Sequence, residues 1–202
     1  MRFVRFSLFA LGLLLVVVPA ASARFDGSAA ARAVAITPAP AFTPAEQYAY
    51  AGANWLTAAG GITDDRYSTL SQINTSNVAN LKIAWQIHLG FKPLPGESAE
   101  GNAVVYNGVM YLPSGTDKIY ALDATTGQQL WYHQDVEPGG LKFLLRINRG
   151  LGIGDGRIYA GQLDGRVVAL DQMTGGTVWD RFVAGTLGER DQAAAHGSRG
   201  VG

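Results

Sequence analysis

The strongest constraint on the fold is an internal repeat in the second half of the chain. Four short elements of a first copy return in a second copy, each 48 residues later. They are Gly-x-x-Tyr at 108–111 and 156–159, Ala-Leu-Asp at 121–123 and 169–171, Thr-Gly at 126–127 and 174–175, and the single residues Trp131 and Trp179. Because four separate elements agree on one spacing, both copies should adopt the same supersecondary unit.

Each copy has the pattern of four short strands joined by tight turns. The expected strands are 103–106, 109–112, 118–122 and 129–133 in the first copy, and 151–153, 157–160, 167–170 and 178–182 in the second. Asn107-Gly108 and Asp155-Gly156 lie at equivalent places and favour primed hairpin turns, which need positive φ. Four strands in a repeat of this length indicate a β-propeller blade. A β-sandwich would not explain the self-match, and a helical solenoid would need an apolar period of 3.6 residues, which the sequence lacks.

The composition excludes several classes of function. The 16 basic and 16 acidic side chains cancel, so there is no electrostatic reason to expect nucleic acid or an anionic membrane surface as a partner. The chain has no cysteine, which excludes disulfides, thiolate metal sites and a cysteine nucleophile.

The chain divides into four parts. Residues 1–23 have the pattern of a signal peptide, with Arg2 and Arg5, the apolar run 6–18 and an Ala-Ser-Ala cleavage pattern at 21–23. An uncleaved membrane anchor is the alternative, but the run is shorter than the roughly 20 residues that span a bilayer. Residues 24–53 are rich in Ala and Pro and are expected to form a flexible leader. A partial propeller over 54–184 and an irregular tail over 185–202 complete the chain.

A third tryptophan precedes the two copies. Trp85 lies 46 residues before Trp131 and ends an expected strand at 82–85. Upstream of this strand, Thr75-Ser76 could cap a short helix through Leu81. We expect 55–89 to supply the outer strand of a blade that the chain does not otherwise contain.

The repeated segments, 121–131 and 169–179, resemble the tryptophan-docking motif of quinoproteins, the dehydrogenases that use pyrroloquinoline quinone (PQQ). Further stretches are similar to the alcohol dehydrogenases of that family, namely 54–81, 100–111, 148–150 and 161–165. The resemblance implies an all-β fold, an incomplete β-propeller of the eight-bladed quinoprotein type with about two four-stranded blades and an N-terminal segment. The tryptophans would then stack on small residues of a neighbouring blade and have no catalytic role.

Glu100 and Arg149 are the candidate binding residues. Glu100 is 48 residues before Asn148, the neighbour of Arg149, so the two side chains come before equivalent strands of consecutive blades. From the residues alone, solvated loop groups are the favoured interpretation of both. The resemblance implies that they contact the quinone cofactor, a task for which the fork of guanidinium donors is suited. Glu97 is the alternative to Glu100, and Gln162 is a weaker candidate in a hairpin near the channel.

The resemblance also implies an activity. It is the oxidation of alcohols at CH–OH with PQQ and with calcium or another divalent or lanthanide ion, in the periplasm, with a cytochrome-type protein as electron acceptor. The metal ligands and the catalytic aspartate of the family lie in later blades, so no residue here is assigned a catalytic or metal-binding role. The alternative is a non-catalytic quinoprotein-like propeller that acts as an envelope scaffold or assembly factor.

Two departures from the family bear on these expectations. Many of its alcohol dehydrogenases have two adjacent cysteines shortly before the Asn-Arg-Gly motif, whereas 141–146 has none. Strand patterning also disappears from Gly185 onward, so we expect a truncated or frame-shifted product or a fragmentary gene model. An open propeller exposes faces that neighbouring blades should cover, so the isolated mature chain is predicted to be poorly folded or to aggregate, and inactive.

Overall fold

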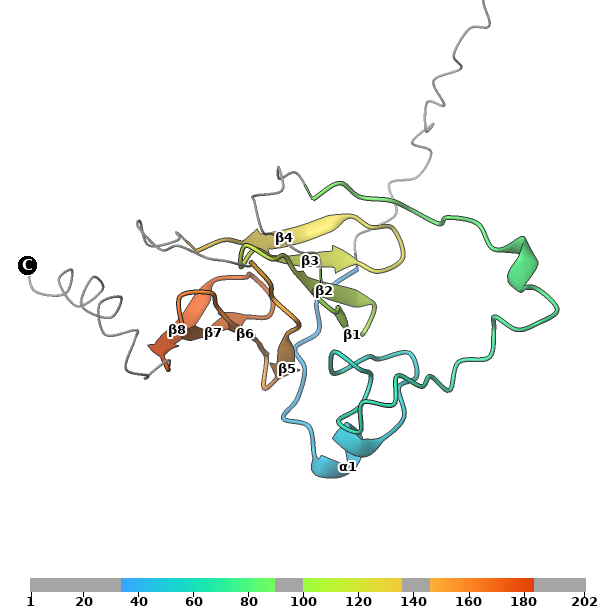
Figure 1. Cartoon of the computed structure of the whole chain (residues 1–202), viewed down its shortest axis with the longest axis horizontal. Coiled ribbons are helices and arrows are strands. Elements are labelled where there is room, and N and C mark those ends of the chain that lie inside the picture. The colour runs from blue at the N-terminus through green and yellow to red at the C-terminus, as the bar shows by residue number, and fades with distance from the viewer. Residues whose placement is uncertain (1–33, 90–99, 136–145, 184–202) are drawn as a thin grey trace, which may run out of the picture. The chain divides into compact units, whose positions relative to one another are not determined.

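The computed structural model describes residues 34–89, 100–135 and 146–183, and the structural statements below concern these residues. Most of their regular structure is two four-stranded antiparallel sheets, each in chain order (Figure 1). The first sheet holds β1 (Val104–Tyr106), β2 (Val109–Pro113), β3 (Ile119–Asp123) and β4 (Gln129–His133), and the second β5 (Gly152–Gly154), β6 (Arg157–Gly161), β7 (Arg166–Asp171) and β8 (Thr177–Phe182). The all-β prediction is confirmed, and each end of every strand lies within one residue of its expected position. Two short helices, α1 (Pro44–Tyr48) and the 3₁₀ helix η1 (Val78–Asn80), precede the sheets.

The two sheets are copies of one another in register as well as in sequence. Tyr111 pairs with Ala121, which pairs with Trp131, and the same triplet recurs 48 residues later. A register shift follows the alanine in both copies. The first hairpin turns also match, because Asn107 and Gly108 have φ of 47° and 78°. These positive angles, with their counterparts at 155–156, are those of the predicted primed turns.

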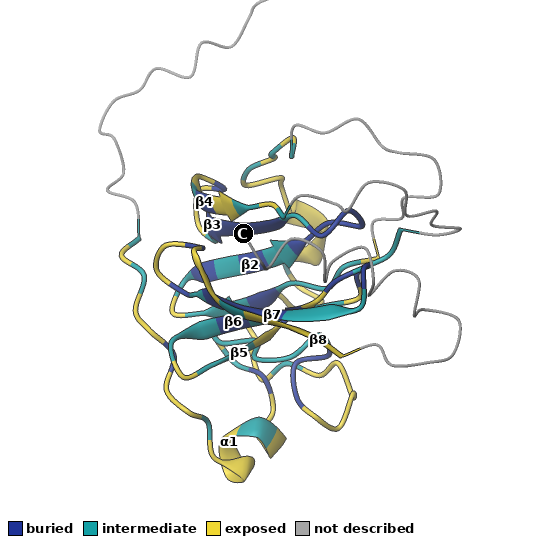
Figure 2. Cartoon of the chain, turned by 90° about the vertical axis from the view of Figure 1, so that its left-hand side faces the viewer, coloured by how far each residue is buried: buried dark blue, intermediate teal, exposed yellow. Residues whose placement is uncertain are grey.

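The core lies between the two sheets. Buried residues lie on strands of both sheets (Figure 2). Their side chains form one core cluster. Its members are Val104, Val109, Tyr111, Ile119, Ala121 and Trp131 from the first sheet, and Leu151, Ile158, Ala160, Val168 and Leu170 from the second sheet and the residue before it. The sheets therefore pack face to face, as neighbouring blades do, and each is stabilised by the apolar area that the other covers.

Two tryptophans dock on the turns of a following sheet. The indole N–H of Trp131 donates to the carbonyl of Gln172 at 3.1 Å, and its ring lies against Gly175. Trp85 makes the equivalent contacts on the first sheet, with the carbonyl of Ala124 at 3.0 Å and with Gly127. The predicted stacking on small residues is thus confirmed for Trp131, and Trp85 makes the same kind of contact.

The N-terminal segment differs from expectation in two places. Residues 81–89 form no strand, because no neighbouring strand in the described part of the chain offers a partner for their main chain. The expected helix from Thr75-Ser76 is only the turn η1, whose N-cap Asn77 makes no capping bond. Asn74 accepts the Ser76 N–H at 3.0 Å, a local bond that competes with helix formation.

Part of the expected flexible leader has definite structure. Within 34–53, Thr43 and Glu46 form a reciprocal capping box on α1, and Ala39 is buried. The main chain of this stretch also bonds to both sheets. The expectation of a flexible leader therefore does not hold for 34–53. Residues 24–33, the signal-peptide region and the tail lie outside the described residues.

Candidate functional site

The structure brings the two predicted binding residues together. A nitrogen of the Arg149 guanidinium, Nη1, lies 3.2 Å from Oε2 of Glu100. Both side chains reach solvent, with 78% of Arg149 and 42% of Glu100 exposed. An ion pair this exposed contributes only about 0–1 kcal/mol to stability. The pair is therefore better suited to meeting a ligand than to holding the fold.

Main-chain contacts position the two segments that carry this pair. The main-chain N–H and the side-chain Nδ2 of Asn102 both donate to the carbonyl of Arg149, at 3.3 and 3.2 Å. Gly101 has no room for a side chain, because a Cβ would lie 2.7 Å from the carbonyl oxygen of Pro113. The starts of the two sheets are thus tied together directly beside the charged pair.

Asn148, the neighbour of Arg149, has a structural role. Its side chain is buried, donates to the carbonyl of Gly161 at 3.1 Å and accepts the N–H of Gly150 at 3.1 Å. These bonds connect the segment before β5 to the end of β6. Because Asn148 is held inside, Arg149 is the group that projects outward at this point.

The exposed guanidinium of Arg149 has the chemistry to meet an anionic or oxygen-rich ligand. A guanidinium carries five donors in a planar fork that matches carboxylate and carbonyl oxygens. No group of three or more His, Cys, Asp or Glu side chains that could hold a metal occurs in the described segments. Glu97, the alternative to Glu100, lies outside them.

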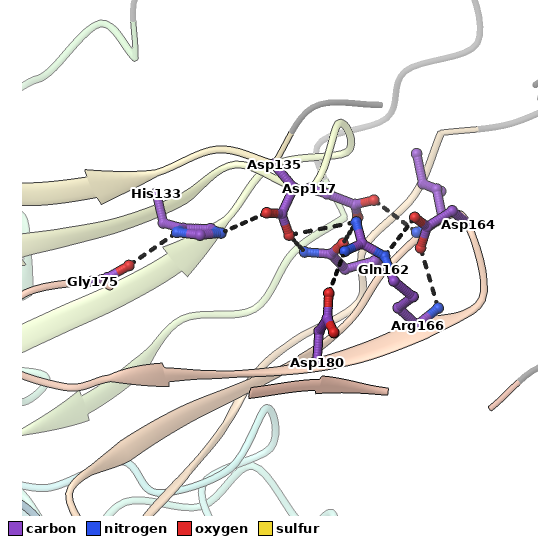
Figure 3. A network of polar contacts seen from close by, with 9 residues as sticks. Asp117, His133, Asp135, Gln162, Asp164, Arg166, Gly175 and Asp180 are labelled. Carbon is purple, nitrogen blue, oxygen red and sulfur yellow. Dashed lines mark hydrogen bonds and ion pairs between the residues drawn. The ribbon is translucent and has the colours of Figure 1, made fainter. Parts of the chain in front are cut away.

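Gln162, the third candidate, belongs to a polar network between the sheets (Figure 3). Its oxygen accepts from Arg166 Nη2 at 2.9 Å, and its nitrogen donates to Asp135. Arg166 also donates to Asp164 at 2.7 Å and to Asp180 at 2.8 Å. Gln162 is therefore occupied by protein partners.

Burial and the neighbouring carboxylates have opposite effects on the pKa of the Arg166 guanidinium. Burial alone would lower the pKa of its guanidinium, but hydrogen bonds to Asp164 and Asp180 outweigh that effect and the pKa is raised. Beyond Asp135, the ring of His133 lies 3.3 Å from an oxygen of that carboxylate and 2.9 Å from the carbonyl of Gly175. The network thus connects β4 of the first sheet to β7 and β8 of the second.

Sequence reasoning missed this network. It identified only Gln162, as a weaker candidate in a hairpin near the channel. A signal was available, since Arg166 is 48 residues after Lys118 and the repeat thus keeps a cation at that position. The partners of Arg166 are Asp180 on β8 and three residues outside the strands, Asp135, Gln162 and Asp164, and none of them is repeated at the 48-residue spacing.

Residues 55–187 match a protein family described as PQQ, glucose/ethanol/alcohol dehydrogenase, β-propeller domain. The alcohol dehydrogenase (quinone) dehydrogenase subunit of Gluconacetobacter polyoxogenes is 40% identical over 129 residues, which cover 62% of this chain and 17% of that protein. The 1-butanol dehydrogenase (cytochrome c) of Thauera butanivorans is 35% identical over 134 residues, 65% of this chain and 19% of that protein.

A solved structure agrees with the sequence matches. The crystal structure of quinohemoprotein alcohol dehydrogenase from Comamonas testosteroni superimposes with a TM-score of 0.58 at 32% identity, over 64% of this chain and 19% of that one. Together with the two stacked sheets, this match confirms the prediction of a partial quinoprotein-type β-propeller. The chain spans less than a fifth of the length of these relatives.

No helix in the described part of the chain is long and apolar enough to cross a membrane.

Proposed function

Because the chain belongs to the PQQ-dependent glucose/ethanol/alcohol dehydrogenase family, we propose that it forms the N-terminal part of a periplasmic dehydrogenase that oxidises alcohols. In this proposal the chain supplies two blades and one edge of the cofactor site. The match over 55–187 supports the family, and the names of the relatives support alcohols as the substrate class.

The observation that carries the proposal is the meeting of Glu100 and Arg149. They precede the first strands of consecutive blades, and their side chains approach to 3.2 Å. Family resemblance assigns quinone contact to both positions. The residues fit that role, because PQQ presents carboxylate and carbonyl oxygens and the Arg149 guanidinium is mostly exposed.

The chain itself would bind and orient the cofactor. Arg149 would donate hydrogen bonds to its oxygens, while Glu100 keeps the guanidinium in place. Bound PQQ supplies the redox chemistry, since it accepts the two electrons that leave the CH–OH group. Residues beyond those described would supply the ligands of calcium or of another divalent or lanthanide ion, the catalytic base and the rest of the cofactor site. A cytochrome-type protein would take the electrons.

We further propose that the chain is inactive alone and is exported. Its two blades bear Glu100 and Arg149 but no described metal site, and the second sheet leaves Trp179 only half-buried. Export is supported by the signal-peptide pattern of residues 1–23.

Cofactor binding to the chain tests the proposal. We would titrate PQQ with calcium into the chain and follow the heat of binding, comparing wild type with Arg149→Ala. Arg66→Ala is the matched control, because Arg66 is also exposed and pairs with an aspartate, Asp64, at 3.7 Å. We expect Arg149→Ala to weaken binding at least tenfold and Arg66→Ala to leave it unchanged. Equal binding by all three, or none by wild type, would favour the non-catalytic propeller for this chain.

A further inference from the structure

A short segment before α1 runs along the hairpin turns of both sheets. We call residues 34–40 the strap (blue in Figure 1). It contacts the turns at the ends of β1 and β3 in the first sheet and of β5 and β7 in the second.

The strap is held through its main chain. In the first sheet, the N–H of Val34 donates to Oδ2 of Asp123 at 3.0 Å. In the second, the N–H groups of Gly156 and Asp155 donate to two successive strap carbonyls, at 2.7 and 3.0 Å. Contacts of this kind depend on the main-chain conformation of a peptide and only little on its side chains.

Gln172 is the central anchor of the strap. Its Oε1 accepts the N–H of Ala39 at 2.6 Å, and its Nε2 donates to the carbonyl of Thr37 at 3.2 Å. The same nitrogen donates to the Tyr111 hydroxyl at 3.0 Å, and the whole residue is buried, with 0% exposed. A buried amide that lacks hydrogen-bond partners is unfavourable. The buried amide of Gln172 therefore favours a peptide main chain beside it, because that main chain supplies its hydrogen-bond partners.

Gln172 has no equivalent in the first copy of the repeat. The residue 48 positions before Gln172 is Ala124, which has no amide to offer. The first sheet thus holds the strap at its Asp123 carboxylate, whereas the second adds a side-chain amide. The pKa of Asp123 is lowered, chiefly by the hydrogen bond from the Val34 N–H, with burial opposing and the N–H groups of Thr125 and Thr126 adding to it.

Apolar contacts and prolines complete the arrangement. Val34 and Ile36 pack against the core cluster, and Ala39 is 3% exposed. Pro38 and Pro40 have fixed φ angles, which lowers the entropy that the segment loses when it is held.

We propose that the two sheets together form a binding site for the main chain of a short proline-containing peptide, and that the strap is its intramolecular ligand. By bonding to both sheets, the strap holds the two blades against each other on the side of the β1–β2 and β5–β6 turns. This proposal does not depend on cofactor binding.

The first test uses the wild-type chain. Amide hydrogen exchange, read by nuclear magnetic resonance, should show the N–H groups of Val34 and Ala39 exchanging at least tenfold more slowly than that of Ala35. The N–H of Ala35 makes no hydrogen bond to any described residue. Equal exchange at the three amides would overturn the proposal, whatever any variant does.

The second test supplies the strap in trans. Ala39→Pro in the chain removes the N–H that bonds to Gln172 and should free the site. A fluorescent peptide of residues 33–42 should then bind this variant at least tenfold more tightly than it binds wild type, whose own strap fills the site. Ala35→Pro in the chain is the matched control and should behave as wild type.

Substitution within the peptide separates specific from adventitious binding. The peptide with Ala39→Pro should lose at least tenfold in affinity, while that with Ala35→Pro should keep its affinity. Equal binding of both peptides, or no binding to the Ala39→Pro chain, would refute a peptide site.

Discussion

The hydroxyl of Tyr111 accepts a hydrogen bond from Nε2 of Gln172 across the interface between the two sheets, at 3.0 Å. Both side chains are fully buried. Tyr111 also contacts Trp131, with ring centroids 5.8 Å apart and ring planes tilted by 43°. Tyr111 and Gln172 therefore lie at the centre of the contact between the blades.

Tyr111→Phe should destabilise the chain by about 1–3 kcal/mol, because it leaves a buried amide donor of Gln172 without that acceptor. The urea midpoint of the variant measures the loss. Tyr132→Phe is the control, since Tyr132 is 57% exposed and should tolerate the change. Equal midpoints for the two variants would show that the bond contributes nothing.

Stability should fall between pH 10 and 12 through the same tyrosine. Burial raises the pKa of Tyr111 to about 12 from an ordinary value of 10.0, while the hydrogen bond from Gln172 opposes the rise. The unfolded chain therefore releases this proton first, so the stabilisation is complete below pH 10 and is lost as pH rises toward 12. Urea unfolding over this range should show a shallower decline for Tyr111→Phe than for wild type.

Gly175→Ala should destabilise the chain by at least about 1–2 kcal/mol, the cost of a left-handed backbone conformation in a residue with a side chain. Gly175 has a φ of 73°, and a Cβ there would lie 2.6 Å from Cε3 of Trp131. Gly161→Ala is the matched control, because nothing lies within 4 Å of its Cβ position. Thermal unfolding of both variants, followed by tryptophan fluorescence, would reveal the difference.

Trp131→Ala should strongly destabilise the contact between the two sheets. Aromatic truncation in a core costs about 3–5 kcal/mol, which approaches the whole stability of a small domain. Trp179→Ala should cost much less, since no described sheet follows to cover Trp179. Calorimetric scans would test this, and similar scans for the two variants would mean that the second tryptophan is also buried.

Arg166→Leu should destabilise the chain by about 2 kcal/mol. Breaking a fully buried ion pair would cost more, but the guanidinium of Arg166 keeps some contact with solvent. The physical reason is that Asp164, with 5% of its side chain exposed, would lose its cation. Arg157→Leu, which breaks an exposed pair with Asp155, should leave the urea midpoint nearly unchanged. Adding Asp164→Leu to the Arg166→Leu variant should restore part of the loss.

Much of the fold could be predicted because its signals are local and repeated. The Asn107-Gly108 and Asp155-Gly156 turns fix hairpins within a few residues, and the 48-residue spacing assigns the same strands to both copies. The candidate pair followed from the same spacing, since equivalent places in adjacent blades bring Glu100 and Arg149 close together.

The failures share a cause, which is that their partners are distant in sequence. Residues 82–85 have the composition of a strand, but a strand exists only where a second main chain lies beside it. The strap has no periodic side-chain pattern, because its main chain makes the contacts and Gln172, 133 residues away from Ala39, receives them.

The sequence alone therefore determined the units in the described part of the chain: eight strands, their turns and the tryptophans that dock between sheets. Only the tertiary structure decided how the units are joined, through the strap, the buried Gln172 amide and the Arg166 network. Turn and strand preferences act between neighbours in the chain, whereas burial and hydrogen bonding of a polar group depend on what the whole fold places around it.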